Sequence, residues 1–254
     1  MEKIGTAGWS IPREVAERFS GEGSTLERYA RVFPGVEINS SFYRPHRRTT
    51  YERWAASTPE GFRFAVKAPR TVTHERRLAE PSEPLGRFFE EIGGLGEKLG
   101  PVLIQLPPSL VFDTTAGRFI AGWRKRYDGP TVLEPRHSSW FAREVDERLA
   151  EARIGRVAAD PAVVPEAARP GGWRGLTYLR LHGSPVMYGS AYDDEALAEA
   201  QAMLAQRPAG TQAWCVFDNT RLGAAADDAL RLMERLRPQR SPAPGRRPGA
   251  AVPS

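Results

Sequence analysis

Short runs of β-branched and aliphatic residues alternate with amphipathic segments along most of this 254-residue chain. Parallel strands need a long crossover between them, usually a helix, so this alternation is typical of βαβ units. Eight such alternations within about 235 residues favour a closed (β/α)8 TIM barrel over an open doubly wound sheet. We expect the strands at residues 3–8, 35–40, 63–68, 102–106, 131–134, 155–159, 177–182 and 212–218.

The segments between these strands repeat apolar residues at helical intervals. They predict helices at 25–33, 50–57, 85–99, 115–127, 143–152, 193–206 and 222–236, with Thr25, Thr50 and Asp193 as candidate N-caps. The sixth crossover differs, because Pro161, Pro165, Pro170 and Gly171-Gly172 fill its place; we expect a short or irregular sixth helix. Residues 1–237 are predicted to form one TIM-barrel domain. Residues 238–254, rich in Pro, Arg and Ala, are predicted to be a disordered tail.

The only cysteine, Cys215, excludes an internal disulfide and fits a reducing compartment. Its place within the 213–217 apolar run favours a buried structural thiol. The first residues lack the apolar stretch of a signal peptide, and no apolar run approaches the ~20 residues that span a bilayer. We therefore expect a cytoplasmic protein without membrane contact, whose oligomeric state is not set by these features.

The net charge of +5 raises the question of a nucleic-acid partner. Four arginines of the terminal stretch, at 237, 240, 246 and 247, account for 4 of these 5 charges, which leaves the body near +1. The segment 44–77 is nevertheless locally basic, with nine Arg and Lys residues against three glutamates. Nucleic acid binding by this basic surface therefore stays open as an alternative.

Ionic and amide side chains recur at the downstream ends of the predicted strands. An ionised side chain moved into a protein interior costs several kcal/mol unless it is paired. If Val36 and Ile38 face the helices, alternation along each strand turns the polar residues into the barrel. Active sites of such barrels lie at this end of the strands. We expect these residues to converge there: Glu37, Asn39, Lys67, Gln105, Glu134, Arg180 and His182.

The segment from Glu134 to Trp140 places a carboxylate, a guanidinium, an imidazole and an indole together. We predict Glu134 as the principal acid/base group and Glu37 as its partner. The alternatives are a structural Glu–Arg pair and a Glu37 neutralised by Lys67 or Arg180. His74 and His182 are candidate catalytic proton donors or ligands, although His182 also fits a core histidine with a backbone partner.

Lys67, Arg136 and Arg180 form a candidate anion clamp, suited to phosphate or carboxylate. These residues predict a small anionic, sugar-like or phosphorylated metabolite as ligand. The other candidate substrate-binding residues supply amides, an imidazole and aromatic rings that can stack on a sugar or pack a loop: Asn39, Gln105, Asn219, His137, Trp9, Tyr43 and Trp140.

Several catalytic signatures are missing from the sequence. There is no GxGxxG or Walker pattern, no Gly-x-Ser-x-Gly, no His-Glu-x-x-His and no cysteine pair. A mixed site of Glu37, His74, Glu134 and His182 with Asp160 or Asp218 is conceivable, but its spacing is not diagnostic. A divalent metal is possible and not favoured, and no cofactor is specified.

Seven ordered motifs resemble the YecE-like family of TIM-barrel proteins, domain of unknown function 72. They run from about Ile4 to Leu236, and the tail lies outside them. The matching residues are Gly5-x-x-Gly8-Trp9, Glu37-x-Asn39-Ser40-Ser41-Phe42-Tyr43, Phe62-x-Phe64-x-x-Lys67-x-Pro69 with Thr73-His74, Gln105-Leu106-Pro107-Pro108, Glu134-x-Arg136-His137-x-Ser139-Trp140, Arg180-x-His182-Gly183 and Phe217-Asp218-Asn219. The family pattern has Asn-Asn where this chain has Asp218-Asn219.

The resemblance implies a TIM barrel and sugar-isomerase-like chemistry, and it transfers no catalytic residue. Together with the residues, it predicts an enzyme that isomerises or hydrolyses the anionic metabolite by acid/base chemistry. The two alternatives are a nucleic-acid-associated protein and a sensor that binds a ligand without converting it.

Overall fold

The computed structural model describes residues 2–237, which form an α/β fold built on parallel strands. A four-stranded sheet has the order β1-β10-β9-β7, and a six-stranded sheet has the order β2-β3-β4-β5-β6-β8. All pairs are parallel except β6 with β8. The strands are β1 Lys3–Thr6, β2 Gly35–Ile38, β3 Arg63–Lys67, β4 Leu99–Gln105, β5 Thr131–Glu134, β6 Gly155–Arg156, β7 Ala158–Asp160, β8 Gly171–Gly172, β9 Leu176–Leu181 and β10 Gln212–Phe217.

The two sheets approach each other at two places without forming one continuous ladder. Between β1 and β2 there is an isolated bridge from Ala7 to Glu37, where the Gly8 amide donates to the Glu37 carbonyl at 2.8 Å. On the other side Val157 alone separates β6, which pairs with β5, from β7, which pairs with β9. The predicted α/β class with parallel strands is confirmed. The predicted closed barrel is not, because these sheets remain two.

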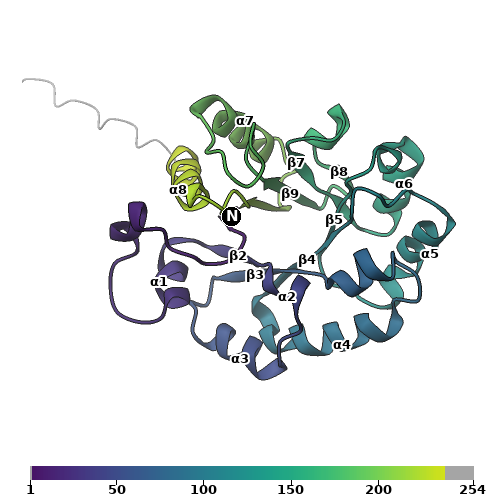
Figure 1. Cartoon of the computed structure of the whole chain (residues 1–254), viewed down its shortest axis with the longest axis horizontal. Coiled ribbons are helices and arrows are strands. Elements are labelled where there is room, and N and C mark those ends of the chain that lie inside the picture. Colours follow the sequence, from purple (N-terminus) through teal and green to yellow (C-terminus); the bar gives the residue numbers. More distant parts are fainter. Residues whose placement is uncertain (1, 238–254) are drawn as a thin grey trace, which may run out of the picture.

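Helices lie around the periphery and the strands toward the middle (Figure 1). Among the helices of residues 2–237, none is long and apolar enough to cross a bilayer. The α-helices are α1 Thr25–Val32, α2 Ser40–Tyr43, α3 Arg48–Ala56, α4 Ser82–Ile92, α5 Thr114–Gly122, α6 Arg143–Glu151, α7 Asp194–Ala205 and α8 Ala224–Leu236. Shorter helical segments are η1 Arg13–Phe19, η2 Thr71–Glu75, η3 Gly93–Lys98, η4 Trp123–Lys125, η5 Ser138–Phe141 and η6 Pro165–Ala168.

Local side chains explain where several helices begin. Ser24 caps α1 in a reciprocal capping box with Glu27, so the predicted cap at Thr25 is wrong by one residue. The predicted cap Asp193 is confirmed, because its carboxylate accepts the Ala196 amide at 2.9 Å. The Thr50 cap is wrong, since α3 already begins at Arg48. The short sixth helix is confirmed as η6, a single four-residue turn.

The strands bury apolar side chains on both of their faces. Outward residues such as Val36 and Ile38 pack with the helices, as predicted. A second cluster fills the space between the two sheets, and it consists of Ala65, Leu103, Val132, Val157, Leu176, Tyr178, Trp214 and Val216. Because side chains alternate along a strand, the residue two positions after Ala65, Val132, Tyr178 or Val216 faces the same interior. Those residues are Lys67, Glu134, Arg180 and Asp218.

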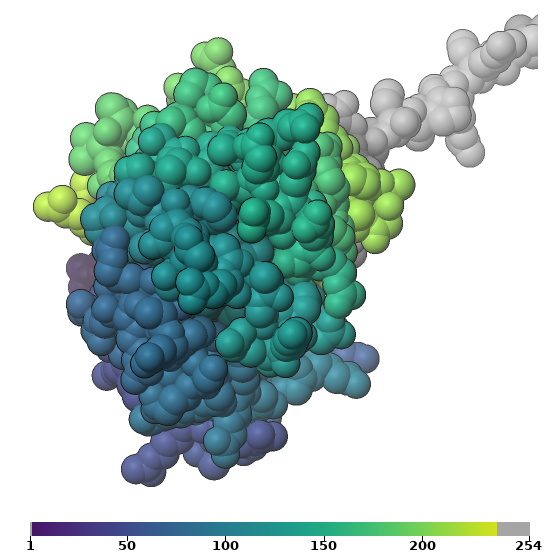
Figure 2. Space-filling view, turned by 90° about the vertical axis from the view of Figure 1, so that its right-hand side faces the viewer, coloured from purple at the N-terminus to yellow at the C-terminus, as the bar shows by residue number. Residues whose placement is uncertain are grey.

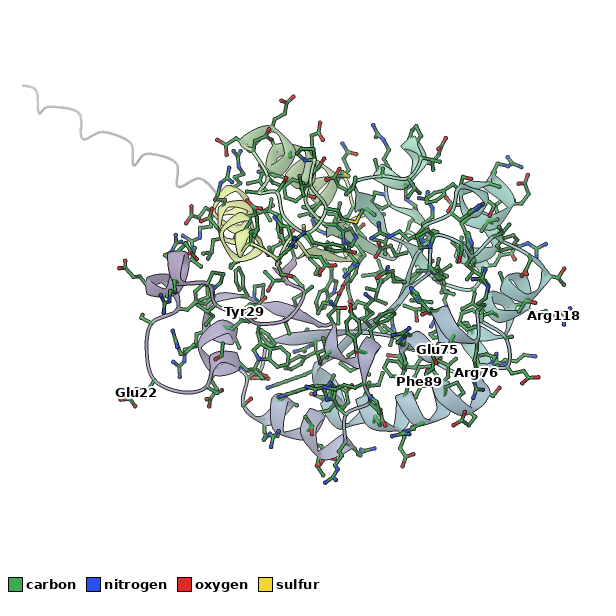
Figure 3. All side chains as sticks on the ribbon, viewed as in Figure 1. Glu22, Tyr29, Glu75, Arg76, Phe89 and Arg118 are labelled. Atoms are coloured by element: carbon green, nitrogen blue, oxygen red, sulfur yellow. The ribbon has the colours of Figure 1, made fainter. Side chains whose placement is uncertain are left out.

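Tyr29 of α1 fastens β1 beside β2, where the strand ladder is interrupted (Figure 3). Its hydroxyl accepts the Thr6 amide at 2.8 Å and lies 2.9 Å from the Thr6 hydroxyl.

The side of the molecule that carries the middle of the sequence is a continuous, rounded surface in the space-filling view (Figure 2). The predicted tail at 238–254 lies outside the described residues.

Candidate functional site

Arg180 is the centre of a buried ionic cluster at the carboxyl ends of the strands. It is the fifth residue of β9 and has no exposed surface. Its Nε and Nη2 donate to the two oxygens of Glu37 at 3.0 and 2.7 Å. Its Nη1 donates to Glu134 at 2.8 Å, and Nη2 also donates to Asp218 at 2.9 Å. One guanidinium thus joins the ends of β2, β5, β9 and β10, which confirms the predicted convergence for Glu37, Glu134 and Arg180.

Glu134 is the last residue of β5 and is fully buried. Its Oε1 lies 2.6 Å from Nη2 of Arg136 and 3.0 Å from Nε2 of His182. Burial alone would raise the pKa of Glu134, but Arg180, His182 and Arg136 hold that pKa well below its usual range. A carboxylate that stays ionised in this way is a poor proton acceptor and cannot serve as an acid near neutral pH. The geometry therefore favours Glu134 as a partner of Arg180 and not as the predicted acid/base group.

His182 uses both ring nitrogens inside the cluster. Nδ1 lies 3.1 Å from Asp218, and Nε2 lies 3.0 Å from Glu134 and 2.7 Å from Nη2 of Arg136. The ring is fully buried, and the Tyr188 ring meets it edge-on at 5.6 Å between centroids. In this arrangement His182 positions carboxylates and has no nitrogen left for a ligand.

Two members of the cluster were missed or left open by the sequence argument. Tyr178 donates its hydroxyl to Glu37 at 2.9 Å. The sequence could have indicated this residue, because Tyr178 precedes Arg180 by two residues and so shares its face of the strand. Asp218 was considered only as a metal ligand, yet it accepts from Arg180 and lies beside His182. Burial opposes its ionisation, but Arg180 and the His182 bond lower the pKa of Asp218 below its usual value.

Lys67 is the exception to this dense pairing. It ends β3 with 5% of its surface exposed, and among residues 2–237 its ammonium makes no ion pair or hydrogen bond. Its Nζ lies 4.3 Å from the centroid of the Phe42 ring. Burial and the Arg180 charge lower the pKa of Lys67 to about 8, against the pull of Glu37, Asp218 and Glu134. This is a partly desolvated amine that changes charge near neutral pH.

His74 flanks the same Phe42 ring, with 4.9 Å between the two centroids. Its Nδ1 lies 2.9 Å from the Thr73 hydroxyl. Burial first, and then Lys67 and Arg70, lower the pKa of His74 below its usual value. The neutral form of His74 is therefore favoured relative to an ordinary histidine. Lys67 and His74 thus contact the same aromatic ring. They lie beside the Arg180 cluster, whose carboxylates are already bound by Arg180.

Three polar atoms of predicted binding residues lack a hydrogen-bond partner within residues 2–237. They are Asn39 Oδ1, Arg136 Nε and Asn219 Oδ1, and all three are buried. Asn219 otherwise donates to the Ser190 carbonyl at 2.9 Å and to Asp228 at 2.7 Å. A buried unpartnered polar atom costs about 1–3 kcal/mol.

The remaining predicted binding residues have local structural contacts. Trp140 is fully buried against Phe112 and donates its indole N–H to the Leu110 carbonyl at 2.8 Å. His137 caps η5 by accepting the Ser139 amide. These contacts give Trp140 and His137 no evident ligand role.

Trp9 meets Trp54 edge-on, with ring centroids 5.1 Å apart. Gln105 ends β4 beside Glu134 and is half-buried. Tyr43 is 67% exposed. These three residues lie where a ligand can reach them, and their binding role remains a prediction.

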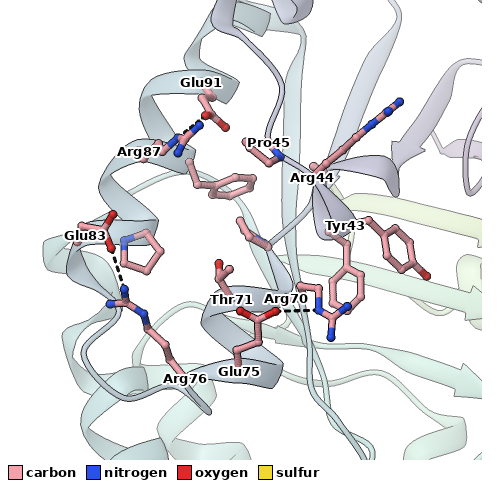
Figure 4. Close-up of a pocket in the computed structure, with 15 residues that line it drawn as sticks. Tyr43, Arg44, Pro45, Arg70, Thr71, Glu75, Arg76, Glu83, Arg87 and Glu91 are labelled. Atoms are coloured by element: carbon pink, nitrogen blue, oxygen red, sulfur yellow. Dashed lines mark hydrogen bonds and ion pairs between the residues drawn. The ribbon is translucent and has the colours of Figure 1, made fainter.

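A separate cavity of about 370 Å³ opens beside the predicted basic segment (Figure 4). Three Arg–Glu pairs surround it, Arg70–Glu75, Arg76–Glu83 and Arg87–Glu91, at 2.9–3.0 Å. Phe42 lines this cavity and also contacts Lys67 and His74. Two of the segment's arginines, Arg70 and Arg76, are thus neutralised, which weakens the surface as a phosphate-binding patch.

Metal coordination was the least specified of the predictions. Within residues 2–237, no group of three or more His, Cys, Asp or Glu side chains is arranged to hold a metal ion. Glu37 and Glu134, the strongest candidate ligands, direct their oxygens at Arg180. Cys215 is fully buried as predicted, and burial raises the pKa of its thiol.

Residues 3–251 match the family described as "Protein of unknown function DUF72". The chain belongs to this family. Among curated relatives, UPF0759 protein YunF of Bacillus subtilis is 26% identical, over 93% of this chain and 95% of that protein. UPF0759 protein YecE of Escherichia coli K12 is 30% identical, over 67% of this chain and 62% of that protein. The family match extends into the segment predicted as a tail.

Solved DUF72 structures share the fold. A DUF72 family protein from Enterococcus faecalis V583 superposes with a TM-score of 0.79 at 21% identity, covering 95% of this chain and 97% of that one. A DUF72 family protein from Thermotoga maritima MSB8 gives a TM-score of 0.75 at 26% identity, covering 93% and 99%. The resemblance inferred from the seven motifs is confirmed. The printed descriptions assign no activity.

Proposed function

We propose that this DUF72 protein is a cytoplasmic enzyme with a (β/α)8 barrel-like active site that isomerises or hydrolyses a small anionic, sugar-like or phosphorylated metabolite. One observation carries the proposal: the Lys67 ammonium has no ionic partner within residues 2–237, while its neighbours Glu37, Glu134 and Asp218 are bound by Arg180. An anionic ligand can accept hydrogen bonds from the Lys67 ammonium, which has no acceptor among these residues.

The charges of the cluster are balanced when Lys67 is protonated. Glu37, Glu134 and Asp218 carry three negative charges, and Arg180 and Arg136 carry two positive ones. Adding the Lys67 ammonium makes these six groups neutral overall. Because Arg180 already binds the three carboxylates, the Lys67 ammonium remains as a cation that can donate to a ligand.

Proton transfer is assigned to Lys67 and His74 in this proposal. Both side chains flank Phe42, and both have a pKa lowered by burial. Lys67, with a pKa of about 8, titrates near the operating pH, as an effective general acid or base should. Glu134 and Glu37 instead hold Arg180, and through it they fix the ends of four strands.

Ligand binding tests the proposal. A thermal-shift screen with inorganic phosphate, sugar phosphates and sugar acids should raise the melting temperature, because these anions bind the native state. Lys67→Met should abolish the shift, whereas Lys125→Met, which removes an exposed lysine, should retain it. An unchanged shift in Lys67→Met would reject Lys67 as the anion site.

Turnover and salt dependence separate this proposal from its two alternatives. Incubation of the binding anions with the protein, followed by proton NMR, should show a new sugar product. Binding without any product supports a ligand sensor instead. Tight binding of an oligonucleotide that weakens steeply with salt, through counterion release, supports the nucleic-acid alternative.

A further inference from the structure

We infer that Lys67 forms a covalent imine with an aldehyde or ketone that carries a carboxylate or phosphate group. This inference rests on the proposed function and names its substrate class. Its basis is that Lys67 is an amine at a strand end, enclosed by an aromatic ring and a buried ionic cluster, without a partner among residues 2–237.

The reaction requires a neutral amine that a small molecule can reach. Lys67 Nζ is not among the buried atoms that lack a partner, so this nitrogen keeps some contact with solvent. The pKa of about 8 leaves roughly one tenth of the amine neutral at pH 7. A lysine with the ordinary value of 10.5 is neutral in only about one molecule in three thousand at this pH. Lys67 is thus favoured by roughly two orders of magnitude.

The bond changes balance without any oxidant or reductant. The Nζ lone pair bonds to the carbonyl carbon, the carbonyl π pair moves to oxygen, and one Nζ proton moves to that oxygen. The carbinolamine then loses water: the hydroxyl takes the second Nζ proton and leaves as the nitrogen forms the C=N bond. His74 contacts the same Phe42 ring as Lys67, and in this inference it carries these protons. Both amine hydrogens and the carbonyl oxygen leave together as one water molecule.

The carboxylates near Lys67 can stabilise the charged form of the product. Glu37, Asp218 and Glu134 favour a positive charge at this nitrogen, against burial and the Arg180 charge. In this inference the Arg136 guanidinium, which is 8% exposed, pairs with the anionic group of the same molecule. Arg136 lies two residues after β5, and β5 is two strands from β3, which Lys67 ends; this separation is about 10 Å at the backbone. A short-chain oxo acid or a sugar phosphate fits this span.

The chain contains four lysines, Lys3, Lys67, Lys98 and Lys125, so each adduct can be located. Lys98 is the matched control. Its pKa is also lowered by burial, but its Nζ donates to the carbonyls of Ala55 and Thr58 at 2.6 and 2.5 Å and to the Thr58 hydroxyl at 3.1 Å. Comparing the two lysines separates a free amine from one whose hydrogens are engaged.

The experiment is reductive trapping on the full chain. Glyoxylate, pyruvate and dihydroxyacetone phosphate are each incubated with the protein and sodium cyanoborohydride at pH 7, and adducts are located by peptide mass spectrometry. We expect at least one probe to give a single adduct at Lys67, at least tenfold above Lys98. Lys67→Arg should lose this adduct, and Lys98→Arg should keep it. Absence of an adduct at Lys67 with all three probes, or equal labelling of the four lysines, overturns the inference.

A second measurement separates this inference from the proposed function. Lys67→Arg keeps the positive charge but cannot form an imine, so it should retain the thermal shift with inorganic phosphate. If the wild type shifts with phosphate and shows no trapping, the imine is wrong and anion binding stands. If neither occurs, both fall.

Discussion

Arg180 and Glu37 form a two-point ion pair in which Nε and Nη2 of the guanidinium each bind one carboxylate oxygen, at 3.0 and 2.7 Å. The two residues are 143 positions apart and lie in different sheets. Both side chains have no exposed surface. The pair therefore ties the two sheets together at the end of the strands where they share no continuous ladder.

Removing Arg180 should destabilise the fold strongly. Arg180→Met leaves three buried carboxylates without their shared cation, and breaking a buried pair costs about 3–5 kcal/mol. Urea unfolding measures the change. The control is Arg18→Met, whose partner Glu234 and own side chain are about half exposed; it should cost less than about 1 kcal/mol. Equal stabilities of the two variants would show that the cluster does not hold the sheets.

Glu134→Gln should change stability in a pH-dependent way. The pKa of Glu134 lies well below the model-peptide value of 4.5, so its charge contributes stability that is present above pH 4.5 and lost as pH falls further. The wild type should therefore be more stable than Glu134→Gln at pH 7, and the difference should shrink in acid. Glu147→Gln, at an exposed pair with Arg143, should show no such trend. A difference that stays constant from pH 7 to pH 3 would contradict the assignment.

Lys67 should make the opposite contribution at high pH. Its pKa is about 8 in the folded chain and 10.5 in the unfolded one, so between these values the unfolded chain binds more protons. Wild-type stability should rise relative to Lys67→Met over this window, by at most about 3 kcal/mol. Urea unfolding of both proteins at pH 7, 8, 9 and 10 measures the difference. A difference that does not vary across this range would exclude the lowered pKa.

His74 should report on the Lys67 charge. Because the Lys67 ammonium helps to lower the pKa of His74, Lys67→Met should raise that pKa. Proton NMR can follow the four histidines of the chain separately. His46, whose pKa is lowered by burial and by Arg44, serves as the internal control and should not move. An unchanged His74 would place Lys67 too far away for joint proton transfer.

The sequence predicted most strands well because short runs of β-branched and aliphatic residues mark them, and the two-residue alternation within a run sets the face of each side chain. Val132 and Glu134, or Tyr178 and Arg180, occupy the same face at a spacing of two. This pattern does not show which charged side chains will form ion pairs with one another. Neutralisation of Glu37 by Lys67 or Arg180 was one of two alternatives in the sequence, and the structure shows that Arg180 binds both Glu37 and Glu134.

The sheets and loops were harder to predict for a different reason. The strand expected at 155–159 is divided between β6 and β7, which pair with different sheets, and this depends on the twist of distant strands. Trp140 looks like a pocket aromatic in sequence, but the Leu110 carbonyl, 30 residues away, takes its N–H. The sheet that a strand joins and the partner of a loop side chain both depend on contacts between segments far apart in the sequence.

The central claim is that Lys67 is a free, partly desolvated amine beside a saturated ionic cluster. NMR titration of the side-chain carbons next to the amines, in protein labelled with ¹³C-lysine, tests it directly, since only four lysines contribute. The account predicts that one lysine titrates near pH 8 and that its signal disappears in Lys67→Arg. Titration of the Lys67 signal at the ordinary value near 10.5 would contradict the account.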